Sequence, residues 1–145
     1  MTRHLVTGAA AAVALLALGA LAPAQAATVN YKADLEASSE VPPNTGNGKG
    51  SLTATYDTTS RKLTYQGSYS GLSGPAIAAH FHGPAGPGKN AGVLVPVKAA
   101  NGSFEGSATL TEAQAKDLAD GEMYFNIHTA AHKGGEIRGQ VMKAE

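Results

Sequence analysis

The chain of 145 residues contains no cysteine and carries no net charge, because 11 Lys and Arg residues balance 11 Asp and Glu residues. The missing cysteine excludes a disulfide framework, a lipid attached through cysteine and a blue-copper site. Balanced charge leaves no field that would attract nucleic acid or an anionic membrane surface. The fold must therefore be held by burial of apolar side chains, with help from a bound ion where one is present.

The first 26 residues have the pattern of an export signal. After a short polar start, residues 5–21 are mostly apolar, and residues 24–26 read Ala-Gln-Ala, a small-x-small cleavage site. A membrane anchor is the alternative, but the Ala and Gly content of the run and its ending favour removal. We expect residues 1–26 to be a signal peptide and residues 27–145 to be one exported domain, periplasmic or secreted, with no membrane span after processing.

The mature chain alternates apolar and polar residues in short segments, which turn residues interrupt. This pattern predicts an all-β, Greek-key-like antiparallel sandwich or barrel of about seven or eight strands. The capping box of residues 111–114, Thr-Glu-Ala-Gln, predicts one short connecting helix that ends near Gly121. Residues 38–49, rich in proline and glycine, predict a long exposed loop. The expected strands are 29–36, 52–56, 63–69, 76–82, 93–97, 104–110, 123–128 and 137–142.

The histidines that follow the leader form two close groups, His80 with His82 and His128 with His132. On a strand, residues i and i+2 point to the same face about 7 Å apart, so the first pair can converge on one ion. A second pair from a neighbouring strand end would complete a four-ligand set. Imidazole ligands favour copper, or zinc as the alternative, over magnesium or calcium.

A solvated or hydrogen-bonded structural role is the competing interpretation of these histidines. If a metal is bound, His80, His82 and His128 are the strongest ligand candidates, because strands hold side chains more rigidly than loops. His132, in a loop, is the weaker one. Asn126 or Glu136 could orient a ligand imidazole, although each fits an ordinary surface or turn position as well. Metal affinity should weaken below about pH 6 as the imidazoles become protonated.

Three stretches of the chain resemble the CHRD domain, a family named after the extracellular protein chordin. They are residues 79–85 (Ala-His-Phe-His-Gly-Pro-Ala), residues 90–95 (Asn-Ala-Gly-Val-Leu-Val) and residues 121–140, which contain Tyr-Phe-Asn-Ile-His-Thr and Gly-Glu-Ile-Arg-Gly-Gln. With residues 35–43 as its opening, the resemblance covers essentially the whole mature chain. It implies an exported, β-rich single module, and the animal members suggest extracellular binding to proteins.

A more distant likeness is to the copper-zinc superoxide dismutases, which are Greek-key β-sandwiches. The His-x-His strand and the segment 134–141 are similar to their copper-binding strand and terminal Gly/Arg segment. The likeness implies that His80, His82 and either His128 or His132 are copper ligands, and that Arg138 faces an anionic substrate. The chain departs from that family in having no cysteine pair, no long zinc loop and no evident bridging histidine. These departures argue against dismutation, since fold does not fix function.

The sequence thus predicts an exported protein that binds a transition metal, most readily copper, for sequestration, delivery or redox chemistry. The alternative is a non-catalytic module that binds an extracellular or periplasmic protein, or a surface polymer, through its loops. No catalytic residue is predicted, because no nucleophile elbow or phosphate loop frames any serine or threonine.

Overall fold

The computed structural model describes residue 22 and residues 25–145, so most of the expected signal peptide lies outside the described residues. The described part contains ten strands, one short 3₁₀ helix and one α-helix. No helix in it is both long and apolar enough to cross a membrane. The elements are β1 (Thr28–Glu36), η1 (Ala37–Ser39), β2 (Lys49–Asp57), β3 (Lys62–Ser70), β4 (Ala76–His82), β5 (Val93–Val97), β6 (Ala99–Ala100), β7 (Ser103–Thr109), α1 (Glu112–Ala119), β8 (Tyr124–Thr129), β9 (Ile137–Gln140) and β10 (Met142–Lys143).

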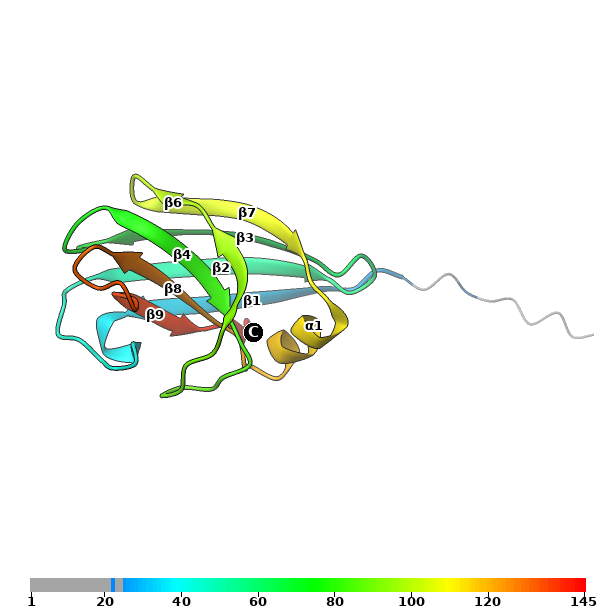
Figure 1. The fold of residues 1–145 in the computed structure, drawn as a ribbon. Coiled ribbons are helices and arrows are strands. Elements are labelled where there is room, and N and C mark those ends of the chain that lie inside the picture. Colours follow the sequence, from blue (N-terminus) through cyan, green and yellow to red (C-terminus); the bar gives the residue numbers. More distant parts are fainter. Residues whose placement is uncertain (1–21, 23–24) are drawn as a thin grey trace, which may run out of the picture.

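All strands pair antiparallel in one sheet with the order β5-β4-β8-β9-β1-β2-β3-β7-β6, and β10 pairs with β1. The sheet curls into a nearly closed barrel (Figure 1). The strands at the two ends of this order, β5 and β6, follow each other in the chain with only Lys98 between them. β5 pairs with β4, and β6 pairs with β7. β4 does not pair with β3, the strand before it in the chain, but with β8. β3 pairs instead with β7, which comes later in the chain. The expected all-β antiparallel barrel is confirmed, with eight strands of four or more residues and two of two residues.

Alternate residues of the strands fill the barrel, as a period of two requires. The interior is aromatic at its centre, where Phe81 and Phe125 meet edge to face at 4.9 Å between ring centroids. The predicted capping box is present in α1, because Thr111 accepts from the Gln114 backbone and the Gln114 side chain accepts from the Thr111 backbone. Leu118 of this helix is fully buried. The helix therefore caps one end of the core as well as connecting β7 to β8.

The outer surface of β4, β8 and β9 is largely buried although its side chains are polar. All six residues of β8 are buried, so both faces of this strand are covered by other parts of the protein. We call this surface the polar face; its members are His80, His82, Tyr124, Asn126, His128, Arg138 and Gln140. Loops 83–92 and 130–136 cover it through the hydrogen bonds described below. The loop that follows η1 was expected to be fully exposed, but Glu40 in it is 4% exposed and packs near this face.

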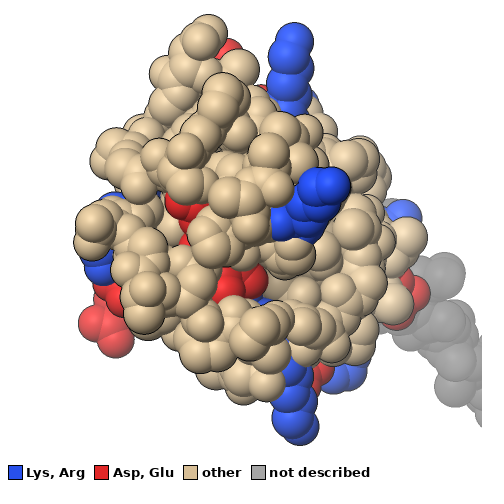
Figure 2. Space-filling model, turned by 60° about the vertical axis from the view of Figure 1, so that its left-hand side comes forward, with Lys and Arg blue, Asp and Glu red and all other residues tan. Residues whose placement is uncertain are grey.

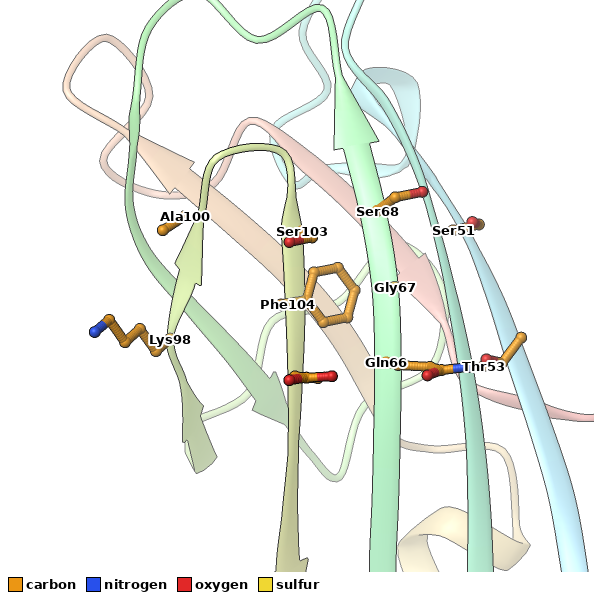
Figure 3. Close-up of a pocket in the computed structure, with 10 residues that line it drawn as sticks. Ser51, Thr53, Gln66, Gly67, Ser68, Lys98, Ala100, Ser103 and Phe104 are labelled. Carbon is orange, nitrogen blue, oxygen red and sulfur yellow. The ribbon is translucent and has the colours of Figure 1, made fainter.

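On the other side of the barrel, β2, β3 and β7 carry an open groove of about 510 Å³. Hydroxyl and amide side chains line it, and the Phe104 ring lies beside Gly67 of the neighbouring strand (Figure 3). A Cβ atom on Gly67 would lie 2.2 Å from the ring and 2.2 Å from the Ser51 carbonyl oxygen. Glycine is therefore required here by close packing.

We predict that Gly67→Ala lowers the free energy of unfolding by roughly 1–3 kcal/mol, because either the ring or the backbone must move. Gly74→Ala is the matched control, since a Cβ there would meet nothing within 4 Å. Urea denaturation of both variants measures the difference. Equal stability of the two would contradict the packing argument.

Candidate metal centre

Three histidines from two neighbouring strands meet on the polar face. His80 and His82 lie on β4 and His128 lies on β8, with Ala78 opposite His128 and His80 opposite Asn126 in the strand register. One ring nitrogen from each histidine lies within 4.8 Å of the others. This cluster could hold a metal ion. His82 and His128 are buried, and His80 is half-buried at the edge of the cluster.

The hydrogen-bond partner of His128 determines which of its ring nitrogens carries the proton. Its Nδ1 lies 2.8 Å from the carbonyl oxygen of Lys133, which can only accept, so Nδ1 carries the hydrogen and donates it. The other nitrogen, Nε2, then keeps a free lone pair and lies 3.0 Å from Nδ1 of His80. Metal-bound histidines in proteins commonly donate their second nitrogen to a carbonyl in this way.

His82 is fixed from the opposite side of the cluster. Its Nδ1 lies 3.0 Å from the carbonyl oxygen of Ala91, and its ring stacks on Tyr124 with 4.7 Å between centroids. The Tyr124 hydroxyl also contacts the backbone of Ala91. Burial, followed by the charges of His128 and His82, lowers the pKa of His80, and burial lowers the pKa of His82. Both rings therefore favour the neutral form that a metal requires.

Arg138, which the likeness to superoxide dismutases placed against an anionic substrate, is buried and bonded to the protein itself. The side chain is 1% exposed, and its guanidinium lies 3.5 Å from the centre of the Tyr124 ring. Its Nη atoms donate to Asn90 at 3.0 Å and to the carbonyl oxygens of Gly86 and Lys89 at 3.3 and 2.7 Å. Arg138 thus holds loop 83–92 against the sheet, and that loop carries the carbonyl that orients His82.

The two residues named as possible supports for a ligand ring have separate roles. Oδ1 of Asn126 lies 2.8 Å from Nε2 of His82, so Asn126 belongs to the cluster. Glu136 instead accepts from the backbone and hydroxyl of Ser73, each at 2.7 Å, and from the Thr129 hydroxyl. Burial alone would raise the pKa of Glu136, but these hydrogen bonds outweigh it and hold the pKa below its usual value. Glu136 therefore ties a loop to β9 and contacts no histidine ring of the cluster.

Two further residues complete the surroundings. The backbone of His132 closes the turn after β8 by bonding to Thr129, and His132 is outside the three-histidine cluster. Glu40 was not singled out from the sequence, because a single carboxylate in a Gly/Pro-rich loop gives no signal of burial. Its Oε1 is the one buried side-chain oxygen or nitrogen in the described residues that has no hydrogen-bond partner. In Figure 2 some acidic side chains lie in recesses near the centre of the view, whereas several Lys and Arg side chains project.

The fold and this cluster define an antiparallel β-barrel protein with three histidines that could hold a metal ion. A family model described as the CHRD domain matches residues 31–141. The chain therefore belongs to the CHRD domain family, as its motifs indicated. No curated protein and no solved structure matches the chain significantly.

The burial of Glu40 predicts a specific pH dependence. Burial raises the pKa of Glu40 to about 7, against a usual value of 4.5. Between these values the folded state binds the proton more tightly than the unfolded state, so the free energy of unfolding falls as pH rises. Glu40→Gln removes this loss. From pH 5 to pH 8 we expect wild type to lose on the order of 1–3 kcal/mol relative to Glu40→Gln, measured by urea denaturation.

The exposed Glu105 supplies the control, as Glu105→Gln should follow wild type at both pH values. Parallel pH profiles for wild type and Glu40→Gln would show that the Glu40 carboxyl is hydrated in solution.

Proposed function

We propose that this CHRD-domain protein is exported and binds one transition-metal ion, copper in preference to zinc, through His80, His82 and His128. The observation that supports this most strongly is the pair of backbone carbonyls on the buried rings. The carbonyl oxygens of Lys133 and Ala91 lie 2.8 and 3.0 Å from Nδ1 of His128 and His82, which directs the Nε2 atoms of both rings away from these loops. Metal-bound histidines commonly use their second ring nitrogen in this way, so the Nε2 atoms are the candidate ligand atoms of these two rings.

The spacing of the donors suits a metal ion. Metal–nitrogen bonds of about 2.0–2.1 Å place neighbouring ligand nitrogens about 2.9–3.4 Å apart, for square-planar and tetrahedral angles respectively. The contact between His80 and His128 measures 3.0 Å, and the whole set lies within 4.8 Å. Metal binding would then replace the hydrogen bond between His80 and His128, and the three rings would move slightly closer together.

Copper is favoured over zinc by the donor set. Imidazole binds both ions, and divalent copper binds more tightly to nitrogen ligands by the Irving–Williams order. No cysteine is available to change that preference. Sequestration or delivery of the ion, or simple redox chemistry, is the role that we propose in the periplasm or outside the cell. His132 would join as a ligand only if its loop moved, and Lys133 holds that loop on His128.

We predict that Cu(II) and Zn(II) each bind at one ion per chain and raise the melting temperature. At a free concentration about 100 times the dissociation constant, the gain is about 2.7 kcal/mol. The double variant His80→Ala, His82→Ala should lose this gain, because two of the three ligands are gone, and His132→Ala should keep it. Calorimetric titration and thermal unfolding measure both effects. If neither metal changes the melting temperature, the proposed metal binding is contradicted and the non-catalytic binding module is favoured.

Export predicts a defined mature protein. Cleavage after residue 26 should leave Ala27 as the first residue, and the intact mass of protein recovered outside the cytoplasm tests this. A full-length mass in the membrane fraction would show that residues 1–26 act as an anchor.

A further inference from the structure

His82 lies between two groups that both need a proton from it. Nδ1 faces the carbonyl oxygen of Ala91 at 3.0 Å, and Nε2 faces Oδ1 of Asn126 at 2.8 Å. A neutral imidazole has one N–H, so one of these contacts must bring two lone pairs together. Both His82 and Asn126 are buried, at 7% and 3% exposure, where such a contact is costly.

Turning over the Asn126 amide would relieve this contact only by directing Oδ1 at the carbonyl oxygen of Gly134. Nδ2 of Asn126 faces this oxygen at 3.5 Å. The Glu40 carboxyl lies on the same side, since a Cβ atom on Gly135 would be 2.2 Å from Oε1 of Glu40 and 2.6 Å from Nδ2 of Asn126. The present orientation, with Oδ1 toward His82, lets Nδ2 donate to the Gly134 carbonyl.

A cation that accepts both lone pairs at once removes the conflict. Two ligands about 2.0–2.1 Å from one ion and about 90° apart are separated by about 2.9 Å, close to the 2.8 Å between Nε2 and Oδ1.

We propose that Oδ1 of Asn126 is the fourth protein ligand of the metal centre, so that three imidazole nitrogens and one amide oxygen bind a divalent ion. The inference rests on the proposed metal-binding function and adds to it the oxidation state of the ion. An amide oxygen is a hard, neutral donor, which suits Cu(II) or Zn(II) and offers little to Cu(I).

The sign of one substitution separates this proposal from its rival. If Oδ1 is a ligand, Asn126→Leu removes a donor and should weaken Cu(II) and Zn(II) binding at least 10-fold. If Asn126 only competes with the metal for Nε2 of His82, the same substitution should strengthen binding. Asn126→Asp keeps an oxygen in the same place and adds a negative charge, so it should bind both ions more tightly than wild type.

Isothermal titration of the mature protein with each metal alone gives the dissociation constants, with exposed Asn30→Leu on β1 as the control. Thermal unfolding without metal shows whether each variant folds. Weakening in Asn126→Leu together with tightening in Asn126→Asp supports the ligand. If Asn126→Leu does not fold, unchanged or weaker binding by Asn126→Asp overturns it.

The same titrations distinguish failure of the fourth ligand from failure of the metal site as a whole. Wild type that binds metal, with Asn126→Leu binding equally or more tightly, overturns the fourth ligand and leaves the three-histidine site in place. Wild type that binds neither ion overturns the proposed function and this inference with it.

Discussion

Burial of polar side chains on the outer surface of β4, β8 and β9 is the constraint on which the rest of the structure depends. A strand with polar residues usually turns them to water, but here loops cover them, and each buried group must find a partner. The covering loops supply backbone carbonyls as those partners. Arg138 binds two of them, Gln140 binds those of Ala85 and Gly121, and the histidines bind two more. The loops and the polar face therefore hold each other in place.

The same network orients the rings of the cluster. Arg138 lies against Tyr124, which stacks on His82, so a charge that holds loop 83–92 also supports the ring that the loop orients. Loop 130–136 does the same for His128 through the Lys133 carbonyl. The centre thus depends on two separate loops, and displacement of either should disturb the geometry without unfolding the barrel core around Phe81 and Phe125.

Much of this could be predicted from the sequence, because strand alternation and a capping box are local signals. The strands and the outward direction of His80 and His82 follow from a period of two, and the helix follows from its capping box. The burial of the polar face could not be predicted, since it arises from loops that are distant in the sequence. For that reason the burial of Arg138 and Glu40, and the contact between Asn126 and His82, have no signal in the sequence.

The central claim is that three imidazoles bind one ion. X-ray absorption spectroscopy of the Cu(II)-loaded protein tests it most directly, because scattering from the outer ring atoms counts the imidazoles bound to copper. The account predicts three imidazoles, from His80, His82 and His128, with nearest neighbours at about 2.0–2.1 Å. A shell of oxygen ligands with one imidazole or none would contradict it and show that the cluster serves the fold alone.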